Sequence, residues 1–256
     1  MSSEPGIRTL GIIPVREADV LAAGRPILLA RRPLLAYTIE AAREASRLVR
    51  VVVSTDGDAA AELARSLGAD APFVRPAELA RPGVGIWQVL QHCVNWLQDQ
   101  QGDRFDTVVL LEASHPVRPR GLVDRVIDAL TSSDFDSVLT AHEERHAFWM
   151  QTPDGEIHPV ALDHESSRQT RPPLFREVAG LACASRHGVV AAGRGPGRNV
   201  GIVPVRSWFG LIDTQDPFGL IVAEKLIEAA REQPAIGGGP LVGIPDPGSA
   251  QTQNRR

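Results

Sequence analysis

The chain alternates short apolar runs with segments whose apolar residues recur every three or four positions. Four of the apolar runs end in polar or charged residues, at positions 11–16, 51–56, 108–112 and 211–216. A short, continuously apolar run is typical of a strand that is buried on both faces of a parallel sheet. The pattern therefore predicts an α/β protein in which several strands deliver polar side chains to one edge of the sheet.

The same pattern gives the order of the elements. We predict strands at 8–15, 49–54, 72–75, 106–112, 136–141 and 199–204, and helices at 33–48, 57–67, 86–97, 120–130 and 216–231. The first helix illustrates the periodicity, because Leu35, Ile39 and Ala42 fall on one face. Strands that alternate with helices favour a mostly parallel sheet with helices on both faces.

Residues 142–193 interrupt this rhythm. Residues 148–158 read as a hairpin around the turn Pro153-Asp154-Gly155, and residues 176–184 read as a further strand. We expect a single α/β domain over 1–233, with 142–193 as an arm inserted into it. The Gly/Pro-rich and polar residues 234–256 are expected to form a flexible tail.

Composition narrows the class of protein. The 256 residues are 43% hydrophobic and 23% charged, with a net charge of −4, which gives no reason to expect nucleic-acid or membrane binding. There is no apolar run long enough for a transmembrane helix and no apolar signal core at the start. Cys93 and Cys183 lack a CxxC spacing, so we expect no disulfide framework and a cytoplasmic location.

Candidate chemistry gathers at the predicted strand ends. Pro14, Val15 and Arg16 follow the first strand, and Glu112 ends the fourth. Asp213 follows a later apolar run and offers a hard oxygen ligand for a metal. Because Lys225 is the single lysine of the chain, its other basic side chains apart from histidine are arginines.

Several strings resemble those of the acylneuraminate (CMP-sialic acid) cytidylyltransferases, in the same order along the chain. They are RPLLAYTI at 32–39, STD at 54–56, FVRPAELA at 73–80, LLEASHPVR at 110–118, RQTRPPLFRE at 168–177 and IDTQD at 212–216. The resemblance implies a Rossmann-like fold of the nucleotide-diphospho-sugar transferase type. It also implies Mg²⁺-dependent transfer of CMP from CTP to a sugar or sugar-acid-like acceptor, with release of pyrophosphate, and a homodimer formed through the inserted arm.

The resemblance also implies roles for individual residues. Those at the nucleotide would be Pro14, Val15, Arg16, Arg25 and Arg75. Arg16 and Asp213 would be catalytic, with Asp213 holding the metal. Glu112, Arg168 and Gln169 would contact the acceptor.

Residues 17–26 depart from the family at the loop that grips the phosphates. Glu17-Ala18 replaces a pair of glycines, and the family's lysine position falls near Val20. The negative charges of two acids there, Glu17 and Asp19, would repel a triphosphate.

The base and acceptor pockets depart as well. Residues 81–85 replace hydroxyl side chains that help to recognise cytosine, Glu112 replaces a glutamine, and His115 replaces a serine. A carboxylate at 112 suits a cationic acceptor group or a metal, and it would repel an acidic sugar.

Structural interpretations stay open for most of these residues. Arg16 could be a salt-bridged surface arginine, Ser54-Thr55-Asp56 and Thr214 could be helix caps, and Glu112 could pair with Arg118. The corresponding alternative function is a non-catalytic family member that serves as a nucleotide- or sugar-binding subunit or as a partner subunit.

Overall fold

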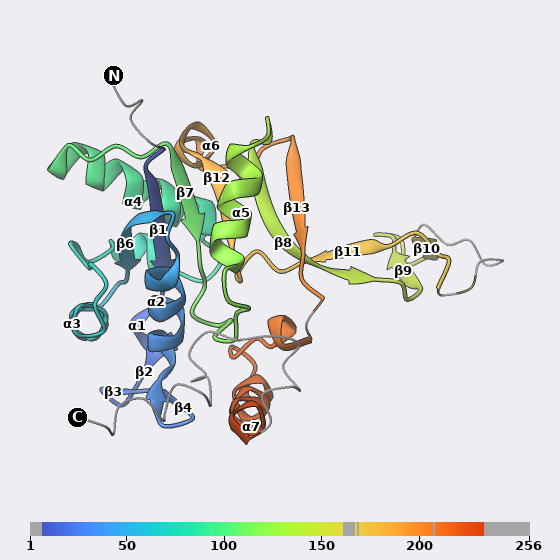
Figure 1. Cartoon of the computed structure of the whole chain (residues 1–256), viewed down its shortest axis with the longest axis horizontal. Coiled ribbons are helices and arrows are strands. Elements are labelled where there is room, and N and C mark those ends of the chain that lie inside the picture. Colours follow the sequence, from blue (N-terminus) through green and yellow to red (C-terminus); the bar gives the residue numbers. More distant parts are fainter. Residues whose placement is uncertain (1–6, 161–166, 168, 207, 233–256) are drawn as a thin grey trace, which may run out of the picture.

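A mixed sheet forms the centre of the computed structural model, which describes residues 7–160, 167, 169–206 and 208–232 (Figure 1). Within this part of the chain the sheet has seven strands. Their order is β11 (Leu174–Glu177), β8 (Ser137–Glu144), β12 (Cys183–Arg186), β7 (Thr107–Leu110), β1 (Thr9–Pro14) and β6 (Leu48–Ser54), and β13 (Val200–Pro204) also pairs with β8. Since β1 runs parallel to both β6 and β7, the carboxyl ends of these three strands meet at one edge.

Helices cover both faces of the sheet, as the sequence predicts. The helices α2 (Leu34–Glu44), α3 (Asp58–Ser66) and α5 (Leu122–Thr131) share one core cluster, and α4 (Ile86–Gln101) and α6 (His187–Ala192) share the other. Neighbouring residues of β1 serve opposite faces, because Ile13 belongs to the first cluster and Ile12 to the second. The α/β architecture with a mostly parallel sheet is thus confirmed.

The final helix packs apart from these layers. The helix α7 (Pro217–Glu232) contacts α2 and the short strand β4 (Leu28–Leu29) through a third, smaller cluster. A 3₁₀ turn, η2 (Trp208–Leu211), leads into it from β13. The start of α7 therefore lies below the carboxyl edge of the sheet (Figure 1).

The segment after β1 is folded rather than open. It forms the one-turn helix α1 (Glu17–Val20) and two small hairpins, which pair β2 (Leu21–Ala22) with β3 (Arg25–Pro26) and β4 with β5 (Arg32–Pro33). The first hairpin turns at Ala23 and Gly24, with φ of 49° and 74°, and the second at Ala30 and Arg31, with φ of 46° and 68°. Such left-handed pairs match the twist of two-residue hairpins.

Two sequence predictions need correction. The strand predicted at 72–75 is reduced to an isolated bridge between Thr55 and Val74, followed by the 3₁₀ turn η1 (Ala77–Ala80). The apolar stretch 176–184 is not one strand, because a turn closed by the Leu181 amide and the Val178 carbonyl separates β11 from β12. Uniform apolarity does not reveal such a turn.

The arm and the tail complete the comparison with the prediction. The predicted hairpin is confirmed as β9 (Phe148–Gln151) paired with β10 (Ile157–Val160), and it projects from the body of the molecule (Figure 1). The predicted tail at 234–256 lies outside the described residues. None of the helices in the described ranges has the length and apolarity needed to cross a bilayer.

Candidate functional site

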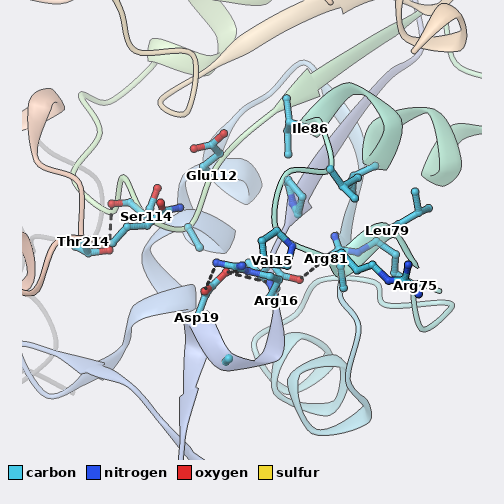
Figure 2. Close-up of a pocket in the computed structure, with 18 of the residues that line it drawn as sticks. Val15, Arg16, Asp19, Arg75, Leu79, Arg81, Ile86, Glu112, Ser114 and Thr214 are labelled. Atoms are coloured by element: carbon cyan, nitrogen blue, oxygen red, sulfur yellow. Dashed lines mark hydrogen bonds and ion pairs between the residues drawn. The ribbon is translucent and has the colours of Figure 1, made fainter. Parts of the chain in front are cut away.

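A cavity of about 570 Å³ opens at the carboxyl ends of β1 and β7 (Figure 2). Its walls come from the β1–α1 junction, the loop between η1 and α4, the end of β7 and the start of the α7 region. Five of the residues singled out from the sequence line it, namely Pro14, Val15, Arg16, Arg75 and Glu112. Segments that are far apart in the chain thus meet in one place.

The remaining sequence candidates lie elsewhere or at the rim. Arg25 is exposed on β3, Gln169 is exposed in the excursion, and neither lines the cavity. Arg168 lies outside the described residues. Asp213 directly precedes Thr214 and Gln215, which do line it. The structure therefore brings together the residues at strand ends but not those in the β2–β3 hairpin or the excursion.

Arg16 is held by Asp19, one turn further along the chain. Its Nε lies 2.9 Å from Asp19 Oδ2, and its Nη2 lies 3.0 Å from Oδ1. This bidentate contact raises the pKa of Arg16, first through the hydrogen bond and then through the charge of Asp19. Asp19 is therefore the counterion of Arg16, and both side chains of this pair are partly exposed.

Glu17 points away from the cavity. Its amide donates to Asp56 Oδ1 at 2.7 Å, and its carboxylate accepts from the amide of Ala60, at 3.2 Å, in the first turn of α3. A carboxylate in that position stabilises a helix N-terminus. Of the two acids that sequence analysis sets against a triphosphate, Glu17 therefore serves α3, and Asp19 alone lines the cavity.

Arg75 is buried at the base of the cavity, with 4% of its surface exposed. Its Nη1 donates to the carbonyl of Ser54 and its Nη2 to the carbonyl of Val15, both at 3.2 Å. Its Nε has no hydrogen-bond partner. Burial lowers the pKa of Arg75, and the charge of Asp56 opposes that shift. The guanidinium thus joins the ends of β1 and β6, while its Nε–H group makes no hydrogen bond.

Arg118 is the largest of the fully buried side chains and clamps the floor of the site. It donates to the carbonyls of Leu181 at 2.8 Å, Glu112 at 2.6 Å and Gly180 at 2.9 Å, and to Thr38 Oγ1 at 2.8 Å. Burial lowers its pKa to about 9, against the attraction of Glu112. Arg118 thus binds the main chain of Glu112, whereas the alternative left open by the sequence was a pairing with its carboxylate.

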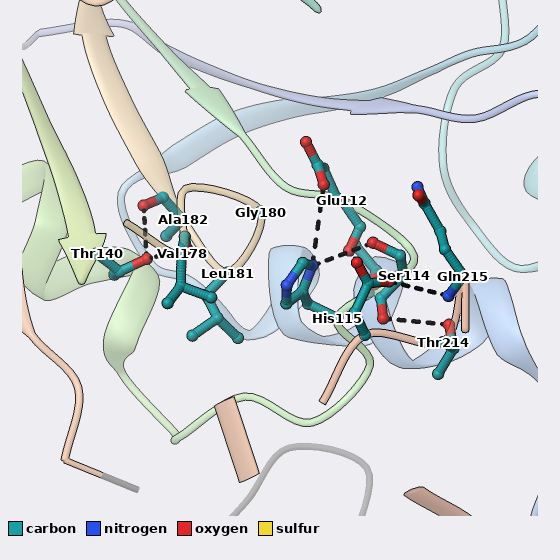
Figure 3. A network of polar contacts seen from close by, with 12 residues as sticks. Glu112, Ser114, His115, Thr140, Val178, Gly180, Leu181, Ala182, Thr214 and Gln215 are labelled. Atoms are coloured by element: carbon teal, nitrogen blue, oxygen red, sulfur yellow. Dashed lines mark hydrogen bonds and ion pairs between the residues drawn. The ribbon is translucent and has the colours of Figure 1, made fainter. Parts of the chain in front are cut away.

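The Glu112 side chain faces the cavity beside His115 (Figure 3). Its Oε2 lies 3.9 Å from His115 Nδ1, and Ser114 Oγ lies 3.1 Å from the same nitrogen. Gly180 makes room for both side chains, because a Cβ there would come within 2.5 Å of His115 Nδ1 and 2.7 Å of Glu112 Oε2. Any larger residue at position 180 would collide with these two side chains, which explains why glycine is needed there.

Burial sets the protonation of this pair. It raises the pKa of Glu112, and the negative charge of Asp213 adds to the shift. It lowers the pKa of His115 to about 4, with help from the positive charge of Arg118. His115 is therefore neutral at pH 7, and Glu112 gives up its proton less readily than an exposed glutamate.

Asp213 is tied to the end of β7 through its neighbour. Both the amide and the hydroxyl of Thr214 donate to the carbonyl of Ser114, at 2.9 and 3.1 Å. The Asp213 carboxylate accepts from the amide of Gln215 at 2.9 Å. The described residues contain no group of three or more His, Cys, Asp or Glu side chains arranged for a metal. Mg²⁺ is commonly held by one or two carboxylates together with substrate phosphates, so this donor fits a cation shared with a ligand.

Sequence reasoning missed the partners that define the site. The i,i+3 spacing of Arg16 and Asp19 is a signal that could have predicted their ion pair. No comparable signal marks Arg118 or Gly180, because most of their neighbours are distant in the sequence. Arg118 donates to residues 38, 180 and 181, and Gly180 lies against Glu112 and His115.

Comparisons with known proteins agree with the fold and the strings. No family model matches the chain. It is 32% identical over 112 residues to N-acylneuraminate cytidylyltransferase of Escherichia coli O18:K1:H7, which covers 43% of this chain and 25% of that protein. It is 34% identical over 113 residues to CMP-N,N'-diacetyllegionaminic acid synthase of Legionella pneumophila, which covers 44% and 48%.

A third relative matches over a longer stretch. Pseudaminic acid cytidylyltransferase of Campylobacter jejuni is 28% identical over 167 residues, which are 63% of this chain and 71% of that protein. The chain spans about a quarter and about half of the lengths of the first two relatives. These homologues support the resemblance to the acylneuraminate cytidylyltransferase-like family at modest identity.

Solved structures share the fold. A CMP:2-keto-3-deoxy-manno-octonic acid synthetase complexed with CTP superposes with a TM-score of 0.64 at 12% identity, covering 87% of this chain and 99% of that one. The expected nucleotide-diphospho-sugar transferase type of fold is thus confirmed.

Proposed function

We propose that this chain, a relative of acylneuraminate-type cytidylyltransferases, transfers CMP from CTP to a sugar or sugar-acid-like acceptor. The observation that carries the proposal is the convergence of the family-like strings on one cavity. Pro14, Val15, Arg16, Arg75 and Glu112 come from separate strings and line the same space at the carboxyl edge of the sheet. Ligands of open α/β sheets bind outside this edge.

In the proposed reaction an acceptor hydroxyl attacks the α-phosphate of CTP. A new oxygen–phosphorus bond forms, the bond to pyrophosphate breaks, and the hydroxyl proton leaves to solvent. Such a transfer depends on positioning and on positive charge near the phosphates. Arg16 supplies that charge when a phosphate replaces Asp19 as its partner. The positive charge of Arg75, buried at the base of the cavity, adds to it. We also propose that Arg25 contacts the nucleotide. It lies on the β2–β3 hairpin, which follows the one-turn helix that begins directly after Arg16.

The acceptor is proposed to lie at the other side of the cavity. Glu112 faces that space, with Arg168 and Gln169 as its further proposed contacts. Cytidylyltransferases of this type use a divalent metal, and we propose Mg²⁺ held by Asp213 and by CTP. Such a cation would reduce the negative charge of the triphosphate.

The arm carries the proposed homodimer contact. Met150 and Ile157 on the β9–β10 hairpin are 55% and 57% exposed, and large apolar side chains at such positions suit a protein interface. We propose that a second copy of the chain covers them. In sedimentation experiments the double variant Met150→Glu, Ile157→Glu should be monomeric where the unaltered chain is dimeric, and an unchanged mass would contradict this contact.

A reducing cytoplasm is the proposed location. Cys93 and Cys183 are both free and buried. Two unpaired thiols suit a compartment that keeps cysteines reduced.

Pyrophosphate release tests the activity. The chain is incubated with CTP, Mg²⁺ and a panel of nonulosonic, octulosonic and amino sugars. We expect release that depends on one class of acceptor and falls at least about 100-fold in Asp213→Ala, with Asp99→Ala on the exposed side of α4 as control. Absence of release with every acceptor would overturn the activity, and an unchanged rate in Asp213→Ala would overturn the metal role.

A further inference from the structure

Glu112 is the carboxylate of the cavity wall that is open to a cationic ligand group. Two carboxylates, those of Asp19 and Glu112, occur among the described lining residues. Arg16 holds Asp19 in a bidentate ion pair. Within the described part of the chain, by contrast, no lysine or arginine forms an ion pair with the Glu112 carboxylate, whose Oε2 lies 3.9 Å from His115 Nδ1. A ligand cation therefore reaches Glu112 without displacing an arginine.

The two basic neighbours of Glu112 do not supply that cation. Burial, together with the charge of Arg118, lowers the pKa of His115 to about 4, so the ring is neutral at pH 7. Arg118 donates to the main-chain carbonyl of Glu112, and its other contacts are two further carbonyls and Thr38 Oγ1. Its hydrogen-bond donors are thus directed at other atoms than the Glu112 carboxylate.

The surroundings of Glu112 favour a positive charge from outside the chain. Burial raises its pKa, the negative charges of Asp213 and Glu177 add to that shift, and Arg118 opposes it. A positive charge placed beside such a carboxylate stabilises its ionised form. Since 30% of the side chain is exposed, a ligand in the cavity can reach it.

The arginines occupy another part of the cavity. Figure 2 shows Arg75 on one side of Arg16 and Glu112 with Ser114 on the other. A triphosphate is attracted to the arginines and repelled by Glu112. The part of the cavity beside Glu112 is therefore left to the acceptor.

We propose that the acceptor carries an ammonium group, as an amino sugar does, and that Glu112 selects it by pairing with that group. The ammonium N–H groups would donate to the Glu112 carboxylate, and such a charge-assisted hydrogen bond is stronger than a neutral one. Glu112 is thus a specificity-determining residue. This inference rests on the proposed function for the reaction, although recognition of the amine by Glu112 requires only binding.

Paired acceptors test the selection. Pyrophosphate release is measured with D-glucosamine and N-acetyl-D-glucosamine, and with the other amino sugars of the panel and their N-acetyl forms. We expect kcat/KM to be at least about tenfold higher for a free amine than for its N-acetyl form. Glu112→Gln should remove that preference by raising KM for the amine, with KM for CTP unchanged, and Glu112→Asp should retain part of it.

Asp19→Asn is the matched control within the cavity. It removes the other lining carboxylate, which Arg16 already occupies, so the preference for the free amine should stay. An equal loss of preference in Asp19→Asn and Glu112→Gln would overturn the inference, because the effect would then come from the general charge of the cavity.

Saturation-transfer NMR with the same sugar pairs, in the presence of CTP and Mg²⁺, tests recognition without turnover. We expect signals from free amines that Glu112→Gln abolishes. Equal signals from amines and their N-acetyl forms, or no signal from any amine, would overturn the inference. An unchanged amine signal in Glu112→Gln, with a higher Mg²⁺ requirement for CTP binding, would assign Glu112 to the metal instead.

Failure of the inference and failure of the activity are distinguishable. A chain that binds amines through Glu112 but releases no pyrophosphate would support the inference and overturn the proposed transfer. Pyrophosphate release without preference for a free amine would support the transfer and overturn the inference.

Discussion

Arg16 and Asp19 form a bidentate ion pair at the mouth of the cavity, with contacts of 2.9 and 3.0 Å. Both side chains are partly exposed, 44% and 35%, so the pair contributes little to stability. Its consequence is electrostatic. A phosphate that approaches Arg16 has to displace Asp19, and the same carboxylate repels it.

Replacing Asp19 with asparagine should tighten CTP binding. The amide would keep the shape of the side chain and a weaker contact to the main chain, and it would free the charge of Arg16. Because exposed ion pairs are worth about 0.2–1 kcal/mol, the expected gain is about two- to fivefold in Kd. Calorimetry in low salt measures it, with Asp99→Asn on the exposed side of α4 as control.

The gain should also require Arg16. In an Arg16→Ala background, Asp19→Asn should leave Kd nearly unchanged. An equal gain with and without Arg16 would show that Asp19 acts by direct repulsion and that the ion pair does not limit binding.

Glu112→Gln should favour acceptors that carry a carboxylate. The Glu112 carboxylate faces the cavity and would repel an acidic sugar, while glutamine removes the charge and keeps the shape. We expect KM for a sugar acid to fall roughly tenfold, which corresponds to about 1.4 kcal/mol, with KM for CTP unchanged. Glu62→Gln on exposed α3 is the control. A rise in KM for the acid would instead indicate that the contact between Glu112 and the acceptor is attractive.

His115 should make the free energy of unfolding depend on pH. Its folded-state pKa is lowered from 6.5 to about 4, so its contribution is present above pH 6.5 and is lost as pH falls toward 4. Glu112 has a raised pKa, and its contribution runs the other way, since it is lost as pH rises. A comparison with His115→Gln therefore isolates the histidine.

Urea unfolding at pH 7.5 and pH 5 measures the effect. Between these values the unaltered chain should lose about 2 kcal/mol more than His115→Gln. Parallel stability curves for the two proteins would mean that His115 titrates in the folded state as it does in water.

Arg118→Ala should destabilise the fold strongly. The change removes four hydrogen bonds. It leaves the buried carbonyls of Gly180 and Leu181 and the partly buried carbonyl of Glu112 without that donor. We expect a loss of about 3 kcal/mol or more, measured by thermal or urea unfolding. Arg120→Ala serves as control, because Arg120 is 41% exposed and its pairing with Glu44 is worth little. Similar losses in the two variants would contradict the clamp.

The sequence predicted the framework of the sheet because buried strands leave a strong local signal. The predicted strands at 49–54 and 106–112 contain the continuous apolar runs 51–53 and 108–111, and both form core strands near the expected bounds. The turn within 176–184 was missed because its residues are as apolar as the strands beside it. The strand at 72–75 was over-predicted, since its backbone makes a single bridge to Thr55.

The charge and hydrogen bonding of the site were harder to predict, because they depend on which side chains meet in the folded protein. Their positions at strand ends place Arg16 and Glu112 in the cavity. Those positions do not reveal that Asp19 forms an ion pair with Arg16, or that burial raises the pKa of Glu112. Arg75 lies at the cavity, yet two of its three guanidinium nitrogens donate to the backbone. Contacts of this kind depend on the folded geometry and leave no periodic pattern.

Titration of the chain with CTP in the presence of Mg²⁺ tests the central claim most directly. The account predicts saturable binding of one CTP per chain that requires the divalent cation and weakens about tenfold or more in Arg16→Ala. No detectable binding at millimolar CTP, with the fold intact by circular dichroism, would contradict it.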